Sequence, residues 1–153
     1  MSLRQSLTKL AHEVPTLRKH LVPLLRGAAV LGDGRYVVAY KEAMEASLAA
    51  MKMGWKLKDI EHWDADRQIA FVDAVLKAHE TAVVLAQKAL GELSKLQGSV
   101  FYEGHRHSQD KRVLEESLHQ HDVRAKGYKK RLYVFLHQDS EANPYPSGRW
   151  WKW

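Results

Sequence analysis

Residues 64–97 read DADRQIAFVDAVLKAHETAVVLAQKALGELSKLQ, and this stretch decides the fold. Apolar residues recur in it at alternating spacings of three and four, which is the pattern of a long amphipathic helix. These positions are Ile69, Val72, Leu76, His79, Val83, Ala86, Leu90 and Leu93. A second stripe runs beside them: Phe71, Val75, Ala78, Ala82, Leu85 and Ala89. Because the combined face is too wide for a two-stranded zipper, we expect this helix to contact at least two neighbours in a bundle.

Both ends of this helix carry residues that favour a helix boundary. Asp64 is suited to cap the first turn, because its carboxylate can accept a backbone N–H there. Gly98 is suited to follow the last turn, where helices commonly end on a left-handed residue. A helix between them would span about 50 Å at 1.5 Å per residue.

Similar patterns lie on either side. Before the central helix, residues 36–54 predict a second helix, with Asp33-Gly34 expected as the turn in front of it. Its expected apolar face is Val37, Tyr40, Met44, Leu48, Met51 and Trp55. After it, residues 98–107 predict a loop and Asp110 begins another helix. The apolar face of that helix is Leu114, Leu118, His121, Ala125, Tyr128, Leu132 and Phe135. Residues 132–136 also suit a strand, so a break at Gly127 is an alternative, but we favour a helix throughout.

The N-terminal segment shows the same alternating spacing of three and four, here mostly with leucines. Its apolar positions are Leu3, Leu7, Leu10, Val14, Leu17, Leu21 and Leu24. Pro15 predicts a kink and a restart, with the proline at the first position of the new helix, because proline has no amide hydrogen to give to a continuing helix. Pro23 is expected to disturb the last turn of that segment.

Residues 3–25 follow the pattern L-R-x-x-L-x-x-L-A-H-x-x-P-x-L-R-x-H-L-x-P-L-L. This pattern resembles a leucine-rich segment that recurs near the N-termini of uncharacterised proteins of tailed bacteriophages and some bacteria. The resemblance implies a phage or bacterial origin and a segment that docks onto another surface. The resemblance carries no catalytic or binding residues over to this chain, and it covers only a small part of the sequence.

Composition and charge limit the classes of function. The chain has 153 residues, no cysteine and a net charge of +6, which suits one globular domain without disulfides or thiolate metal sites. It has no apolar run long enough for a membrane span, and its N-terminus lacks the apolar core of a signal peptide. Residues 123–131 hold five cations and no acid: Arg124, Lys126, Lys129, Lys130 and Arg131. Such a run indicates either a solvated helix face or a nucleic-acid contact.

The histidines and carboxylates give weak signals for chemistry. His105, His107, Glu116 and His119 have ligand-type side chains, but a bundle metal site of the Glu-x-x-His kind needs a second such motif and further glutamates. His79 and His121 differ, because each lies on the apolar face of its helix. They could pair across the interface or bond a buried hydroxyl or carboxylate, but we favour a satisfied or rim-exposed interface histidine without a further role. The acidic cluster at Glu61, Asp64 and Asp66 is explained by a helix N-terminus. No nucleophile elbow, phosphate loop or zincin motif is present, so we expect no catalytic site, cofactor or metal.

The chain ends in SGRWWKW, behind the sequence NPYP, which favours extended backbone. The tryptophans Trp150, Trp151 and Trp153 could stack on unpaired bases, lie in a membrane interface or fill an apolar pocket. Six residues with two cations are too few for a stable membrane anchor. We therefore favour docking, onto a partner or onto the chain's own bundle, and expect these tryptophans to be buried.

Together these patterns predict an all-α antiparallel helical bundle with an extended C-terminal arm. The expected segments are residues 1–31 (Pro-kinked helix), 32–137 (bundle) and 138–153 (arm). We expect a non-enzymatic structural or assembly protein, plausibly of a phage particle, found in the virion or the bacterial cytoplasm. Its expected partner is a protein or a further copy of itself, with no membrane and no small-molecule substrate. The proposed docking residues are Trp150, Trp151, Trp153, Leu7, Leu10, Leu17 and Leu21. The alternative is a nucleic-acid-binding protein that uses the basic run.

Overall fold

The 64–97 stretch forms α3 (Ala65–Leu96), the helix around which the chain is organised. The Asp64 carboxylate accepts the backbone N–H of Arg67 at 3.0 Å, so the expected N-cap is confirmed. At the other end Gly98 has φ +83, as expected of the left-handed residue that follows a helix. This computed structural model describes residues 3–99, 102–137 and 149–152, without the side chains of residues 3, 4, 7, 11, 15 and 17–33.

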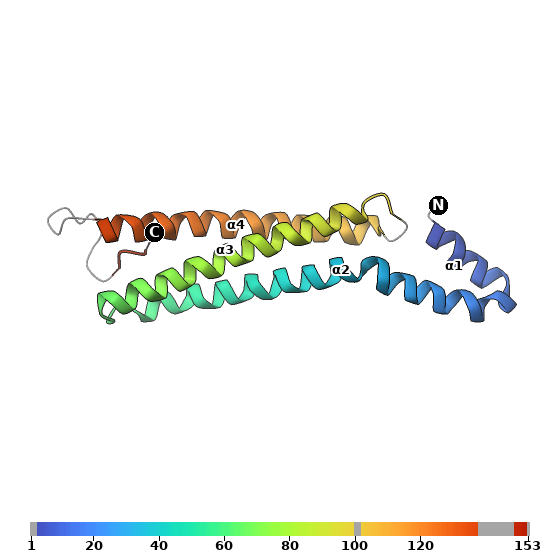
Figure 1. Cartoon of the computed structure of the whole chain (residues 1–153), viewed down its shortest axis with the longest axis horizontal. Helices are drawn as coiled ribbons and strands as arrows, with labels where there is room; N and C mark the ends of the chain where they lie inside the picture. Colours follow the sequence, from blue (N-terminus) through green and yellow to red (C-terminus); the bar gives the residue numbers. More distant parts are fainter. Residues whose placement is uncertain (1–2, 100–101, 138–148, 153) are drawn as a thin grey trace.

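Helices α2 (Pro15–Trp55) and α4 (Gly104–His137) pack on two sides of α3. Helix α3 runs antiparallel to both α2 and α4. The latter two run in the same direction and touch each other much less than each touches α3 (Figure 1). A short 3-10 helix, η1 (Lys56–Asp59), connects α2 to α3. None of the described residues forms a strand, so the all-α bundle is confirmed. None of the described helices combines the length and the apolar character that crossing a membrane requires.

The N-terminal segment forms α1 (Leu3–Glu13), which folds back along the start of α2 (Figure 1). Between them Val14 is extended, and Pro15 is the first residue of α2, as expected. The turn expected at Asp33-Gly34 is wrong, because α2 continues through it and through Pro23 as one helix. Glycine lowers helix propensity by about 1 kcal/mol but does not prevent helical backbone, and packing of the following residues offsets this cost.

Helix α4 also departs from the sequence prediction. It begins at Gly104, so His105 and His107 lie in its first turns and not in a loop. The Nδ1 atom of His107 accepts the backbone N–H of Glu103 at 2.8 Å, which supplies a capping bond before the helix begins. The helix also continues past Gly127, so residues 132–136 are helical. Leu132 and Phe135 pack against the core there, as a continuous helical face requires.

The inner face of α2 is not the one predicted. The residues that it buries are mostly small: Tyr36, Ala39, Ala43 and Ala50. Opposite them α3 buries Ala82, Ala86 and Ala89, so the two helices meet through alanines. Of the expected inner residues, Val37, Leu48, Met51 and Trp55 are exposed. Alanine on both sides allows close approach of two helix axes, which large side chains would prevent. The large apolar residues are therefore displaced to the outside.

The interior has an apolar cluster near each end of the bundle. One joins the end of α2 and η1 to α3 and α4, and it contains Leu57, Ile60, Val72, Val75, Leu76, Ala125, Tyr128, Trp150 and Trp151. The other contains Tyr36, Ala39, Ala43, Ala89, Leu93, Leu96 and Leu114. Along α3 the buried residue His79 lies between the two clusters.

Candidate docking surfaces

The C-terminal tryptophans are built into the chain's own bundle. Trp150 and Trp151 are 1% and 3% exposed, and both belong to the apolar cluster near the start of α3. The Trp150 ring stacks on Phe135 of α4, with centroids 4.3 Å apart and an interplanar angle of 8°. The Trp151 ring meets Trp150 edge-on at 5.6 Å. The expectation that these two tryptophans are buried is confirmed, whereas Trp153 lies outside the described residues.

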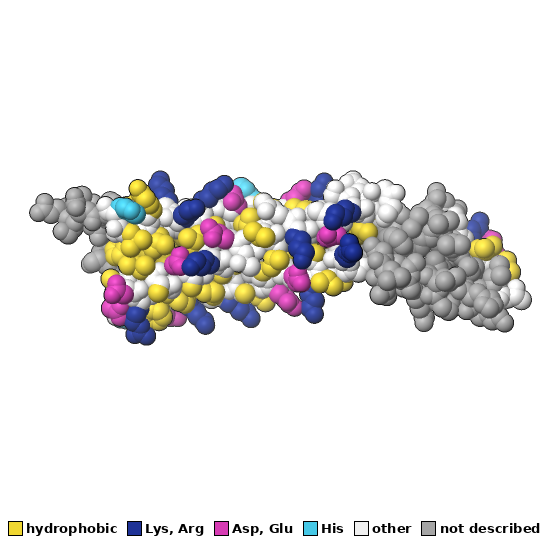
Figure 2. Space-filling model, in the orientation of Figure 1, with side chains coloured by type: hydrophobic (Ala, Val, Ile, Leu, Met, Phe, Trp, Pro, Cys, Tyr) yellow, Lys and Arg dark blue, Asp and Glu magenta, His cyan; other side chains and the backbone are white. Residues whose placement is uncertain are grey.

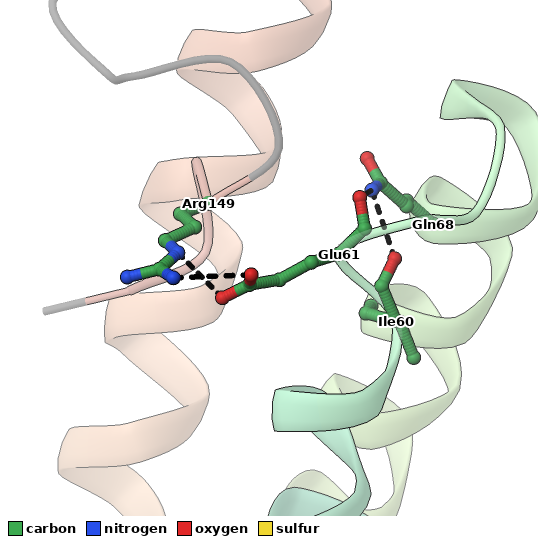
Figure 3. A network of polar contacts seen from close by, with 4 residues as sticks. All are labelled: Ile60, Glu61, Gln68 and Arg149. Carbon is green, nitrogen blue, oxygen red and sulfur yellow. Dashed lines mark hydrogen bonds and ion pairs between the residues drawn. The ribbon is translucent and has the colours of Figure 1, made fainter.

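Polar contacts fix this tail at the η1–α3 connection. The Trp150 indole N–H donates to Gln68 Oε1 at 3.3 Å, and Gln68 Nε2 donates to the carbonyl of Ile60 at 3.0 Å. Arg149 and Glu61 form a two-pronged ion pair, at 2.5 Å between Nε and Oε1 and 3.1 Å between Nη2 and Oε2 (Figure 3). Glu61 thus anchors the tail to the η1–α3 connection. Gln68 is the residue that the sequence patterns missed, because a buried glutamine has no periodic signal.

The other proposed docking residues lie in α1 and the start of α2. Leu10 is 38% exposed on α1, so its side chain is available to a partner. The side chains of Leu7, Leu17 and Leu21 lie outside the described residues. The docking role of the N-terminal leucines therefore stays a prediction.

A further apolar surface lies along one flank of α2, beside the face that α2 buries. We call it the outer α2 stripe, and it consists of Val37, Tyr40, Met44, Leu48, Met51 and Trp55. Val37, Leu48 and Trp55 are 44%, 47% and 59% exposed, and Met51 is exposed as well. Tyr40 and Met44 are partly covered by the neighbouring core. The sequence identified these residues as a helical seam, but only the packing of α2 against α3 places them outside.

The five cations of the basic run do not share a face. Successive residues of a helix are 100° apart, so Lys126 and Lys130 point away from the buried side of α4 while Arg124 and Arg131 lie along one flank. Lys126 is paired with Asp122 at 2.7 Å, and Arg131 donates to the Trp150 carbonyl at 3.5 Å. Figure 2 shows acidic and basic side chains interspersed on one face of the bundle. This arrangement is that of a solvated helix with one tail contact.

His79 and His121 form a buried pair in the middle of the bundle. They are 0% and 3% exposed, and their Nδ1 atoms lie 2.7 Å apart. Pairing across the interface, one of the alternatives that the sequence left open, is confirmed, and neither histidine lies at an exposed rim. His121 Nε2 also lies 2.7 Å from Ser47 Oγ, so the cluster connects α2, α3 and α4. A separation of 2.7 Å leaves room for one shared proton between the two Nδ1 atoms, so the rings cannot both be cationic in this arrangement.

The surroundings of the pair favour neutral imidazoles. Desolvation by burial, with smaller contributions from His121 and Arg124, lowers the pKa of His79 from 6.5 to about 4. Desolvation and Arg124 also lower the pKa of His121. The ring of Tyr128 stacks on His79 at 5.7 Å, and the Nε2 atom of His79 has no hydrogen-bond partner among the described residues. No described acid contacts either ring to stabilise a charge.

The second buried polar contact joins the start of the packed part of α2 to α4. Tyr36 donates its hydroxyl proton to Asp110 Oδ2 at 2.5 Å, and His107 meets the Tyr36 ring edge-on at 5.3 Å. Burial and the Asp110 carboxylate raise the pKa of Tyr36, so the phenol stays protonated. The other residues with ligand-type side chains that the sequence singled out, His105, Glu116 and His119, are exposed on α4. Within the described residues, no three His, Asp or Glu side chains are gathered as metal ligands would be.

Comparison of the chain with protein-family models, with curated proteins and with solved structures found no match.

Proposed function

We propose that this chain is a non-enzymatic assembly protein that binds another protein by packing a helix against the outer α2 stripe. The single observation that carries the proposal is the exposure of that stripe. Val37, Leu48 and Trp55 are each more than two fifths exposed, on a flank of the helix that adjoins the buried residues Tyr36, Ala39 and Ala43. A contiguous apolar stripe on a water-facing helix is unfavourable unless a partner covers it. The resemblance of residues 3–25 supports a phage or bacterial particle as the setting.

The position of the C-terminal tail also supports partner binding at the outer α2 stripe. Since Trp150 and Trp151 fill the chain's own core, they are used to hold the bundle together at its η1 end. Partner binding is then left to exposed surfaces such as the outer α2 stripe, with the N-terminal leucines as a further candidate surface. The basic run gives less support to the nucleic-acid alternative, because its cations are distributed around α4 and two of them are engaged.

The proposal is tested by asking whether the chain's association with another protein depends on the outer α2 stripe. Wild type, a Leu48→Glu/Met51→Glu variant and a Val84→Glu control would be immobilised and exposed to lysate from cells that make the protein. Val84 is 60% exposed on α3, so its substitution changes charge and apolar surface without touching the stripe. Light scattering on the purified chains would report self-association in parallel. We expect association, with another protein or with a second copy, that the control retains and the stripe variant loses. Identical behaviour of all three proteins would contradict the proposal.

A further inference from the structure

The outer α2 stripe has a repeat that suits a straight helical partner. Its residues recur at a period of eleven, with Val37 matched by Leu48, Tyr40 by Met51 and Met44 by Trp55. Eleven residues correspond to about 3.67 per turn over three turns, close to the 3.6 of a straight α-helix. The stripe therefore stays on one side of α2 over its two repeats, with a drift of about 20° per repeat. From residue 37 to residue 55 it extends for about 27 Å, enough for about five turns of a second helix.

The Trp55 end of the stripe adds a pocket. A pocket of about 200 Å³ opens there between the end of α2, η1, α4 and the C-terminal tail. Its apolar lining is Trp55, Leu57, Tyr128 and Trp151, and Lys58, Glu61 and Lys152 lie at it as well. Small-molecule sites are usually about 300 Å³ or more, whereas one large side chain needs less. The pocket thus fits a single apolar anchor on a partner helix.

The charge around this end of the stripe is positive. Lys52, Lys56, Lys58 and Lys152 are all exposed and form no ion pair with another described residue. Of the nearby acids, Glu61 is already paired with Arg149, which leaves Asp59 as the acid next to Lys58. Farther along the stripe Lys41 is paired with Glu45 at 3.9 Å. Lys58 and Lys152 therefore lie at the pocket itself, while Lys52 in α2 and Lys56 in η1 add positive charge to the same end of the stripe.

Given the assembly function proposed above, on which this inference rests, we infer that the outer α2 stripe binds an acidic amphipathic helix of another protein. The partner helix covers Leu48 and Met51 with its apolar side and places one large side chain in the Trp55 pocket. Its Asp and Glu residues lie beside Lys52, Lys56 and Lys58. Complementary charge of this kind selects the partner and speeds its association.

The same observations disfavour the other occupants. Two copies of a chain with a net charge of +6 would bring basic stripes together, so a homodimer has no complementary charge to gain. A nucleic acid would neutralise the lysines and could stack one base on Trp55, but it would leave the aliphatic residues Val37, Leu48 and Met51 uncovered. An acidic helix satisfies both the apolar and the charged parts of the surface.

The test uses the purified full chain and two fluorescently labelled synthetic helices. Both peptides carry two eleven-residue repeats with leucine along one face; one has glutamate on its flanks and the other has lysine. We expect the glutamate peptide to bind at least about tenfold more tightly than the lysine peptide, and less tightly as salt rises. Leu48→Glu should abolish binding. A Lys52→Glu/Lys56→Glu/Lys58→Glu variant should reverse the preference for the two peptides.

The matched control is Lys126→Glu/Lys129→Glu/Lys130→Glu, which makes the same change of charge on α4, and circular dichroism would check that each variant folds. Equal binding of the two peptides, equal loss in the α4 control, competition by a single-stranded oligonucleotide or a stripe-dependent dimer would each overturn the inference. If lysate capture depends on the stripe while the glutamate peptide does not bind, the assembly function stands and the acidic partner is rejected. If neither association depends on the stripe, both proposals fail.

Discussion

Acidification should destabilise this bundle well above the pH at which its carboxylates titrate, because of His79. In the unfolded chain the pKa of a histidine is near 6.5, whereas burial lowers the pKa of His79 in the folded chain to about 4. The unfolded state therefore binds the proton more tightly, and stability that is fully present above pH 6.5 is lost as the pH falls towards 4. The shift is equivalent to a loss of about 2 kcal/mol in the free energy of unfolding at pH 5 and about 3 kcal/mol at pH 4.

The measurement is urea unfolding at a series of pH values from 7 to 5, followed by far-UV circular dichroism. The window stops at pH 5 because below it Asp and Glu titration also contributes. A His79→Gln variant should be less stable at pH 7, since it disturbs the contact with His121, but it should lose much of the dependence on pH. His119→Gln is the matched control, because His119 is exposed on α4 and should leave the pH profile as in wild type. A free energy of unfolding that is constant between pH 7 and pH 5, or an identical slope in His79→Gln, would refute the reasoning.

Three further predictions concern stability at neutral pH. Trp150→Ala should lower the free energy of unfolding by about 3 to 5 kcal/mol, because it leaves a cavity beside Phe135. Trp63→Ala, at a site 37% exposed, should cost much less. Equal losses in chemical denaturation would contradict the structural role of the buried Trp150. Gln68→Leu should cost about 1 to 3 kcal/mol, since it leaves the indole N–H of Trp150 without an acceptor, and a thermal melt matching wild type would count against that bond. Gly98→Ala should cost about 1 to 2 kcal/mol of stability, because alanine is strained at φ +83. Gly91→Ala within α3 should instead stabilise the chain by about 0.5 to 1 kcal/mol. Neither added methyl group meets another atom within 4 Å, so shifts of the denaturant midpoint in opposite directions would report the backbone effect alone.

Much of the helical architecture could be predicted because it is encoded over short distances. The Asp64 cap, the restart at Pro15 and the left-handed Gly98 each depend on a few neighbouring residues, and each was predicted correctly. The errors arose where local signals compete with packing. Asp33-Gly34 is a common turn sequence, yet helix continues through it because the residues that follow pack on α3. The helix start at Gly104 likewise depends on the side chain of His107, which a scan for loops does not weigh.

The candidate site shows the same limit. Periodicity found the seam of Val37, Leu48 and Trp55, but periodicity does not say which of two faces turns inwards. It also identified His79 and His121 as interface positions without supplying the partner Ser47 on a third helix. The pocket beside Trp55 needs residues from α2, η1, α4 and the tail, so no single stretch of sequence contains it.

By itself, then, the sequence determined the helices, several of their boundaries and the apolar residues that must be covered by something. Only the tertiary structure decided what covers them. Alanines on α2 and α3 approach closely and occupy the interior, so the larger residues of α2 stay outside. Trp150 is separated by 82 residues from the Gln68 that holds it. Such pairings depend on the shape and polarity of surfaces that exist only after the helices have packed, and for this reason local patterns do not specify them.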